Sequence, residues 1–248
     1  MLSIFSKKHY LKDYLEGLVD IHCHILPGID DGAKTVEESI EIIQLLHAIG
    51  ISKSIPTPHV MEGFYPNTKE RIQGSYKLLL EGLDKKNIKN NIINPSAEYM
   101  IDSNFENLVN TNNLLPLFRK YILIEMSYFK PSINLHNIIF DLQNLGYIPI
   151  LAHPERYNYF HDNLDYYKEL KSRGCLFQLN LLSLSNHYGE KTKKTAYKLI
   201  QENLIDFTAT DAHNSNHVKK ISEIKIGKSI QKNVSAIITN TTEKFSIV

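Results

Sequence analysis

Short apolar segments alternate with longer helical segments along the 248-residue chain, and this alternation constrains the fold most. The apolar segments lack a clean polar side, which is typical of strands in a parallel sheet covered by helices. The pattern predicts seven strands, at residues 18–21, 51–56, 92–97, 121–124, 148–152, 175–179 and 205–209. It predicts helices at residues 35–49, 69–83, 134–145, 164–172, 192–202 and 218–230.

Seven strand–helix units favour a closed α/β barrel, one unit short of the common eight-unit barrel. We therefore predict a seven-unit, TIM-barrel-like fold, with an open doubly wound sheet as the alternative. No repeat, low-complexity segment or linker divides the chain. Residues 18–248 are expected to form one domain, and residues 1–17 an N-terminal extension that is either packed or frayed.

Composition excludes several classes of protein. The 28 Lys and Arg residues balance 27 Asp and Glu residues, so the basic excess of a nucleic-acid-binding protein is absent from the sequence. No apolar run approaches the roughly 20 residues that a membrane span needs. The two cysteines, Cys23 and Cys175, cannot form a disulfide framework, which fits a reducing compartment. We expect a cytoplasmic protein.

Residues able to bind metal follow six of the seven predicted strands. In parallel α/β folds the active site lies at the carboxyl ends of the strands. The candidates, in chain order, are His22, His24, His59, Glu98, Glu125, His153, Asp211 and His213. Because so many strand ends carry such a residue, the sequence predicts a metal site at this end of the sheet.

The pair His22 and His24 is the strongest single signal, because residues i and i+2 of a strand point the same way. Asp211 and His213 repeat this spacing at the last strand, which neighbours the first in a closed barrel. Asp30-Asp31-Gly32 has the composition of a turn. The sequence has no GxSxG nucleophile elbow, and neither cysteine has an arginine six positions later. A metal-activated water is therefore the expected nucleophile.

Six motifs resemble the PHP (polymerase and histidinol phosphatase) superfamily. They read DIHCHILPGIDDGAKT, IPTPH, AEYM, ILIEMSY, ILAHPERY and TDAHN, and they extend from Asp20 to Asn214. They are most similar to the metal-dependent protein-tyrosine phosphatases of bacterial capsule and exopolysaccharide loci. The resemblance implies a distorted (βα)7 barrel of the PHP type that holds three divalent ions, with manganese expected first and iron or zinc as alternatives.

The resemblance also implies a ligand set. One ion would be held by His22, His24, Glu98 and Asp211, a second by Glu98, Glu125 and His153, and a third by Asp31, His59 and His213. Glu98 would bridge the first two ions. All nine positions are filled, and the ligand role implied for Asp31 replaces its interpretation as a turn residue.

Three residues acquire catalytic roles by the same resemblance. Arg156 of the HPER motif would clamp phosphate, and Asp31 or His213 would assist the leaving group through water. Relatives often carry an arginine soon after the DAHN motif, where this chain has His217, Lys219 and Lys220. This difference leaves the second phosphate contact unassigned.

The implied activity is hydrolysis of phosphotyrosine in a protein, with a bacterial tyrosine kinase of polysaccharide synthesis or export as the expected partner. The sequence leaves the oligomeric state of this protein open. A small-molecule phosphatase, such as histidinol-phosphate phosphatase, is the close alternative, with the same fold and metals. An amidohydrolase would carry a metal-bridging lysine after the fourth strand, where Glu125 stands. The complete nine-residue set argues against a metal-bound protein without activity.

Overall fold

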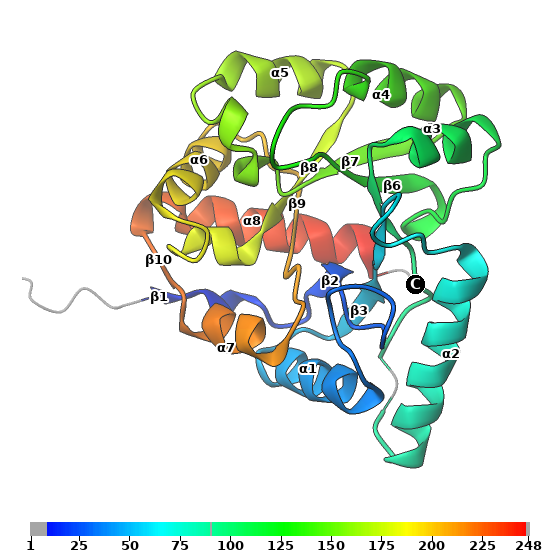
Figure 1. Ribbon diagram of the computed structural model, residues 1–248. Helices are drawn as coiled ribbons and strands as arrows, with labels where there is room; N and C mark the ends of the chain where they lie inside the picture. Colours follow the sequence, from blue (N-terminus) through cyan, green and yellow to red (C-terminus); the bar gives the residue numbers. More distant parts are fainter. Residues whose placement is uncertain (1–8, 90, 247–248) are drawn as a thin grey trace, which may run out of the picture.

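The computed structural model describes residues 9–89 and 91–246, which form an α/β fold with parallel strands and covering helices (Figure 1). The strands are β1 (His9–Tyr10), β2 (Val19–Cys23), β3 (Lys53–Pro56), β4 (His59–Val60), β5 (Glu98–Met100), β6 (Tyr121–Glu125), β7 (Ile148–Ala152), β8 (Leu176–Asn180), β9 (Phe207–Ala209) and β10 (Lys225–Ile226). The helices are α1 (Val36–Ala48), α2 (Lys69–Lys85), α3 (Ser103–Asn110), α4 (Leu135–Asn144), α5 (Leu164–Ser172), α6 (Glu190–Gln201), α7 (Ser215–Glu223) and α8 (Lys228–Phe245). Across the described residues, no helix combines the length and the apolar character needed to cross a membrane.

The parallel strands form two sheets rather than the single seven-stranded ladder that the sequence analysis predicts. Strands β4 to β9 form a six-stranded parallel sheet in chain order, and β2 pairs with β3 alone. The break falls between β3 and β4, where Pro56 and Pro58 flank Thr57. A proline has no backbone N–H to donate to a ladder, so this stretch interrupts the sheet.

Backbone contacts bring the two sheets together at both edges. The His24 N–H donates to the Ala212 carbonyl at 3.0 Å, beyond the carboxyl ends of β2 and β9. On the other side, the Ser96 N–H donates to the Pro56 carbonyl at 2.9 Å. The first and last predicted strands therefore lie next to each other, as the predicted pairing of their polar residues requires.

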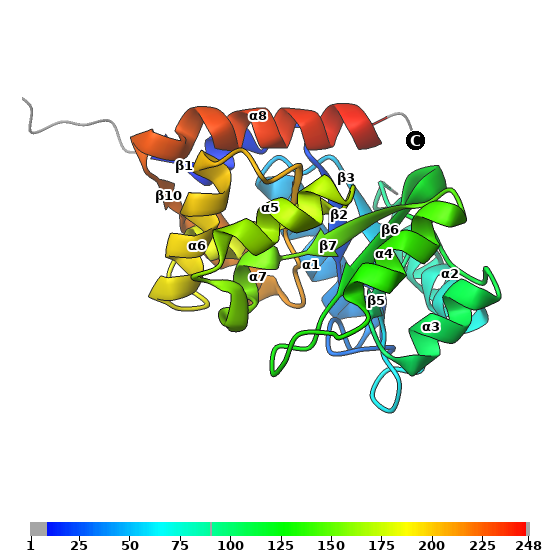
Figure 2. The same ribbon diagram turned by 90° about the horizontal axis from the view of Figure 1, so that it is seen from above.

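A separate apolar cluster fills the space between the strands and a long C-terminal helix. It contains alternate residues of several strands, among them Val19, Ile21, Ile150 and Phe207, together with Phe245 of α8. Helix α8 lies across the amino-terminal end of the strands (Figure 2). The larger core cluster packs the helices on the strands. The interior is thus apolar at the end that α8 covers.

Five of the six predicted helices are confirmed within about two residues, as α1, α2, α4, α5 and α6. Thr35 begins α1, and its hydroxyl accepts from the Glu38 N–H at 3.2 Å. The Glu38 carboxylate accepts from the Lys34 N–H at 2.7 Å rather than from Thr35, so the capping box is displaced by one residue. Helix α1 ends before Gly50, whose φ of +96° is the left-handed conformation expected after a helix.

Two predicted elements are wrong. In place of the strand predicted at residues 92–97, the structure has only an isolated bridge at Ile92, and β5 begins at Glu98, after Pro95. The predicted helix at residues 218–230 is instead the end of α7, the short strand β10 and the start of α8. Ile224 and Gly227 are extended, which ends the first helix and begins the second.

Helix α3 is absent from the sequence prediction. Asp102 caps it by accepting from the Phe105 N–H at 2.8 Å.

Residues 9–17 pack against the rest of the protein. Leu11 and Leu15 are fully buried in the main core, and β1 pairs antiparallel with β10. This described part of the predicted N-terminal extension is therefore packed; residues 1–8 lie outside the described residues.

Candidate metal centre

All nine predicted metal ligands meet at the carboxyl ends of the parallel strands. Their side-chain nitrogen and oxygen atoms form four overlapping groups, each with all its atoms within 4.8 Å of one another. The groups are His24, Asp31, His59 and His213; His22, His24 and Asp211; His22, Glu98 and His153; and His59, Glu98 and Glu125. The sequence therefore predicted which residues come together, and the structure shows that they form one continuous cluster.

Local irregularities of the backbone aim these side chains at one another. The β2–β3 register shifts between Asp20 and Cys23, so Ile21 can face the apolar interior while His22 still faces the cluster. His153 and Asp211 have φ values of +35° and +50°, a left-handed conformation that few residues other than glycine adopt. Such strain is held in place by the surrounding structure and is found at functional sites.

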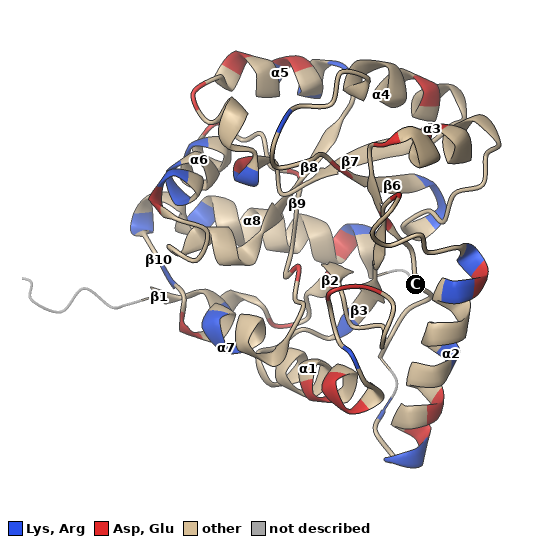
Figure 3. Cartoon of the chain, in the orientation of Figure 1, with Lys and Arg blue, Asp and Glu red and all other residues tan. Residues whose placement is uncertain are grey.

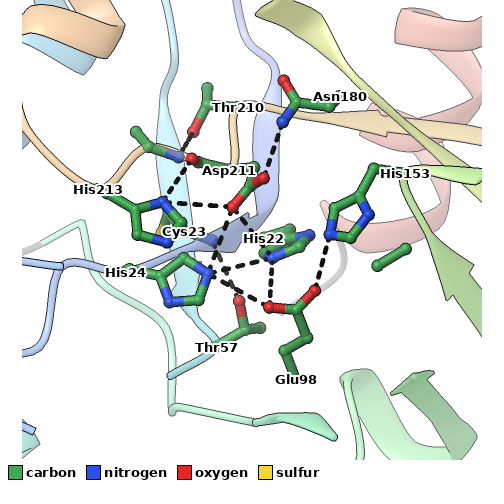
Figure 4. A network of polar contacts seen from close by, with 12 residues as sticks. His22, Cys23, His24, Thr57, Glu98, His153, Asn180, Thr210, Asp211 and His213 are labelled. Carbon is green, nitrogen blue, oxygen red and sulfur yellow. Dashed lines mark hydrogen bonds and ion pairs between the residues drawn. The ribbon is translucent and has the colours of Figure 1, made fainter. Parts of the chain in front are cut away.

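The innermost part of the cluster consists of two imidazoles between two carboxylates (Figure 4). His22 Nε2 and His24 Nε2 are 3.2 Å apart. Glu98 Oε2 lies 3.2 and 3.4 Å from these nitrogens, and Asp211 Oδ1 lies 3.4 and 3.3 Å from them. All four side chains are fully or almost fully buried. Three of these residues, His22, His24 and Asp211, form one of the four groups, whereas Glu98 belongs to the two groups that contain His153 and Glu125.

Hydrogen bonds to the other ring nitrogen fix the tautomers of three histidines. His22 Nδ1 donates to the side-chain oxygen of Gln178 at 2.8 Å, and His24 Nδ1 donates to Asp30 Oδ2 at 2.8 Å. His213 Nδ1 donates to the Asp211 carbonyl at 2.9 Å. Each ring therefore presents the lone pair of Nε2 to the cluster, as metal-binding histidines do when a second group holds the opposite nitrogen.

The surroundings of Glu98 show that these donors fit a metal ion. Among the described residues, its buried Oε2 has no hydrogen-bond partner, although His22 Nε2 and His59 Nδ1 lie 3.2 and 3.0 Å away. An unpaired carboxylate oxygen is costly to bury. Imidazole and carboxylate lone pairs at these distances repel unless a cation lies between them. The donor set therefore fits divalent ions such as manganese, iron or zinc.

The outer part of the cluster is more open to solvent. His59 Nδ1 lies 3.0 Å from Glu125 Oε1, and His59 Nε2 lies 3.4 Å from Asp31 Oδ1. His213 Nε2 lies 3.5 Å from the same Asp31 oxygen. The Asp31 side chain is 50% exposed, whereas Glu125 is buried. The residues implied for the third ion thus form the side of the cluster that a substrate reaches first.

The Asp30-Asp31-Gly32 loop is part of this cluster. Asp30 holds His24, and Asp31 faces His59 and His213. A Cβ atom at Gly32 would lie 2.1 Å from the His24 carbonyl oxygen, so only glycine lets the loop approach this closely. The turn predicted from this tripeptide is therefore also the element that brings both aspartates to the histidines.

Charge within the cluster keeps its buried carboxylates ionised. Burial alone would raise the pKa of Asp211, but His22 and His213 outweigh it and lower that pKa well below its usual value. Burial is likewise outweighed at Glu98, where His22 and His59 lower the pKa of the carboxyl group. This effect requires positive charge beside the carboxylates, which protonated histidines supply without metal and a bound cation would supply when the rings are neutral ligands.

The sequence compares closely with one family of bacterial proteins. A family model described as "Capsular polysaccharide synthesis, CpsB/CapC" matches residues 18–245. The chain belongs to the CpsB/CapC family. It is 36% identical over 198 residues to the tyrosine-protein phosphatase YwqE of Bacillus subtilis, covering 79% of this chain and 78% of YwqE. It is 32% identical over 196 residues to the putative tyrosine-protein phosphatase CapC of Staphylococcus aureus, covering 79% of this chain and 77% of CapC.

A solved structure supports this assignment. It comes from work on YwqE of Bacillus subtilis and CpsB of Streptococcus pneumoniae, described there as unique metal-dependent tyrosine phosphatases. It aligns with a TM-score of 0.74 at 31% identity, over 90% of this chain and 95% of that chain. Membership of the CpsB/CapC family is consistent with the PHP superfamily resemblance.

In this CpsB/CapC protein, Arg156 contacts the metal-binding cluster directly. Its Nη1 donates to Asp211 Oδ2 at 2.7 Å, and the side chain is 19% exposed. The rings of Tyr128 and Tyr188 lie 4.7 and 4.1 Å from the guanidinium carbon. Two cation–π contacts and one ion pair therefore hold the guanidinium beside Asp211.

The residues that orient the ligands were not recognised from the sequence. Gln178 and Asp30 hold His22 and His24, and Asn180 Nδ2 donates to Asp211 Oδ2 at 2.7 Å. Gln178 and Asn180 follow the i, i+2 rule at the end of the sixth strand, which is a signal that could have identified them. Tyr128 and Tyr188 lie in loops and left no comparable pattern.

Two histidines without a predicted role lie beside the cluster. The His217 ring lies 5.7 Å from that of His213, and the His187 ring lies 5.3 Å from that of His217. These two histidines extend the cluster along one side. His161, by contrast, is buried, and its Nε2 donates to the Glu155 carbonyl at 2.8 Å, which is a structural contact.

Proposed function

We propose that this protein is a metal-dependent phosphomonoesterase that removes phosphate from phosphotyrosine in proteins. The observation that carries this proposal is the convergence of nine ligand-type side chains around a buried, unpaired Glu98 oxygen. Family membership supports the choice of phosphotyrosine, since YwqE bears the name of a tyrosine-protein phosphatase. Clustered divalent ions would activate a water and neutralise charge on the phosphoryl oxygens.

The ligand assignment that we propose has three ions, with manganese first and iron or zinc as alternatives. The first would be bound by His22, His24, Glu98 and Asp211, the second by Glu98, Glu125 and His153, and the third by Asp31, His59 and His213. Glu98 is the natural bridge because its Oε2 faces His22, His24 and His59, while its Oε1 lies 3.0 Å from His153 Nε2. His24 could also reach the third ion, because it lies in the same group as Asp31.

Three residues would act on the substrate. Arg156 would exchange its contact with Asp211 for one with the phosphoryl group, and Tyr128 and Tyr188 would keep its fork in position. His213 and Asp31 are the candidates for leaving-group assistance. His213 and His59 outweigh the burial of Asp31 and lower the pKa of its carboxyl group, so Asp31 is ionised and cannot donate a proton. His213 holds its Nδ1 proton on the Asp211 carbonyl and presents Nε2 to the cluster, so we propose that both residues assist the leaving group by orienting a water.

The physiological partner that we propose is a phosphorylated bacterial tyrosine kinase of capsule or exopolysaccharide synthesis. A phenolate has a pKa of about 10 and leaves more readily than an alkoxide, which suits a site that assists the leaving group through an oriented water. Histidinol phosphate remains the alternative substrate, because the same ligand set could hydrolyse any accessible phosphomonoester. A cytoplasmic location also remains a prediction.

We also propose that the two parallel sheets form one distorted seven-stranded barrel, in which β3 and β4 act as a single interrupted strand. The contacts between β2 and β9 and the apolar cluster enclosed by the strands support this description. Residues 18–248 would then form one domain, and residues 9–17 would pack on it.

A turnover panel tests the proposed function. The enzyme would be loaded with manganese and offered a phosphotyrosyl peptide, a phosphoseryl peptide, histidinol phosphate and a phosphodiester. We expect kcat/KM to be highest for the phosphotyrosyl peptide. Higher turnover of histidinol phosphate would replace the proposed substrate, and the absence of turnover for all four would contradict the enzyme assignment.

A further inference from the structure

A group of basic and imidazole side chains lies beside the metal cluster and has no role in the chemistry proposed above. It consists of His187, His217 and Lys220, and we name it the 187–220 cluster. His217 and Lys220 are one helical turn apart on α7, and His187 lies in the loop before α6. The His213 N–H donates to His217 Nδ1 at 3.4 Å, so this group begins directly at the metal cluster.

Hydrogen bonds in the 187–220 cluster leave its donors free to point outward. Lys220 Nζ donates to His187 Nδ1 at 3.3 Å, and the His213 N–H donates to His217 Nδ1. Each imidazole therefore carries its proton on Nε2. Burial, Lys220 and Arg156 together lower the pKa of His187, which keeps this ring neutral. The cluster thus offers two imidazole N–H groups and one ammonium group.

Lys220 differs from its neighbour Lys219 in its charge environment. Both side chains are exposed, but Lys219 Nζ lies 3.5 Å from Glu41 Oε1. Within the described chain, no carboxylate lies within ion-pair distance of Lys220 Nζ. Its positive charge is therefore available to an anionic group that arrives from solvent.

Basic residues occur on α6 and α7, and α2 carries both basic and acidic residues (Figure 3). Near α3, the rim carries Glu62 and Asp102, which are linked by a hydrogen bond from the Glu62 N–H to Asp102 Oδ2 at 2.8 Å.

We propose that the 187–220 cluster is a specificity subsite that binds a carboxylate side chain of the substrate peptide, near its phosphotyrosine. This inference rests on the proposed phosphatase function. Ring-to-ring steps of 5.7 and 5.3 Å separate His213 from His187. An extended peptide advances about 3.3 to 3.6 Å per residue. The preferred carboxylate therefore lies two to four residues from the phosphotyrosine, on one side only.

The test uses the manganese-loaded enzyme and a set of phosphotyrosyl peptides that are otherwise neutral. A single Glu is placed at each position from one to four residues before or after the phosphotyrosine, and each peptide is matched with one that carries Gln there. We expect one position two to four residues away to give a kcat/KM ratio of Glu to Gln of about five, mainly through KM. This ratio corresponds to about 1 kcal/mol, the upper range for an exposed ion pair.

Variants then assign that ratio to the cluster. Lys220→Gln should bring the Glu-to-Gln ratio to about one, and Lys220→Arg should retain most of it. Lys219→Gln is the matched control. Lys219 is adjacent in sequence but already paired with Glu41, so its substitution should leave the ratio unchanged. The subsite is overturned if no position shows a preference, or if Lys220→Gln retains it. If no phosphotyrosyl peptide is hydrolysed, the proposed function itself fails and the subsite fails with it.

Discussion

The two ends of the parallel strands differ in the side chains that they bury. At the amino-terminal end, Phe245 packs its ring against Tyr121 and Phe207 at 5.4 and 5.2 Å, inside a wholly apolar cluster. At the carboxyl end, buried imidazoles and carboxylates face one another, and His153 adopts a left-handed backbone conformation. The first end contributes burial of apolar surface, and the second carries buried charge that protonated histidines or a bound cation would offset.

This difference indicates that stability and chemistry are separable in this protein. Apolar packing contributes to the free energy of folding in proportion to the area removed from water. The mouth contributes preorganised ligands, whose mutual repulsion is a cost to the folded state. Substitutions at one end should therefore affect stability, and substitutions at the other should affect turnover.

The largest effect on turnover is expected for Glu98→Gln. The substitution keeps the shape of the side chain but removes the charge that the proposed bridging ligand supplies. We expect kcat/KM for a phosphotyrosyl peptide to fall at least ~10²-fold, on the order of 3 kcal/mol of barrier. Circular dichroism should show an intact fold. Turnover near that of the parent enzyme at saturating manganese would break the assignment of Glu98.

The converse effect is expected for Phe245→Ala at the apolar end. Removing a fully buried ring leaves a cavity, which should lower the free energy of unfolding by about 3 kcal/mol. The kcat of the molecules that remain folded should stay near that of the parent. Urea unfolding monitored by circular dichroism measures the first quantity. A large loss of kcat without a loss of stability would show that the two ends are coupled.

A smaller effect on turnover is expected for Arg156→Ala. The substitution removes a donor to phosphate and an ion pair to Asp211, while the nine ligand residues remain. We expect kcat/KM to fall at least about tenfold, or about 1.4 kcal/mol, with metal content retained. Elemental analysis of the variant alongside its kinetics is the appropriate measurement. Unchanged kcat/KM with full metal content would remove Arg156 from the site.

Thiol alkylation should have no effect on turnover. Cys23 and Cys175 are both fully buried, and burial raises the pKa of Cys175 to about 12. A thiol with such a pKa is not a nucleophile at neutral pH. Iodoacetamide at pH 8 should leave the native enzyme active while alkylating both cysteines after unfolding, as mass spectrometry would show. Inactivation in step with alkylation would point to a cysteine mechanism instead.

The sequence predicted the residues at the carboxyl ends of the strands better than it predicted the bounds of the strands and helices. The alternation of strands and helices was sufficient to place eight ligand candidates, because a polar side chain at the end of a buried strand needs a partner there. Asp31 came from the family resemblance, since a DDG tripeptide alone indicates a turn. The roles of Gln178 and Asp30 depend on long-range packing, which no local pattern reports.

The errors in the scaffold have local causes. Pro95 interrupts ladder hydrogen bonds, so the third predicted strand was misplaced, and the short strand β4, which follows Pro58, was not predicted. The predicted C-terminal helix continued through Ile224 and Gly227, where tertiary pairing of β10 with β1 imposes extended backbone. A two-residue strand that pairs with a distant segment leaves no periodic signal in the sequence.

Metal content measures the central claim most directly. The protein would be purified without chelator, dialysed against manganese, freed of unbound ion and analysed by elemental mass spectrometry. The ligand assignment that we propose predicts close to three divalent ions per chain. Glu98→Gln, prepared in parallel, should bind fewer ions while remaining folded. A parent protein that contains only trace metal, yet hydrolyses a phosphotyrosyl peptide in the presence of chelator, would contradict the account.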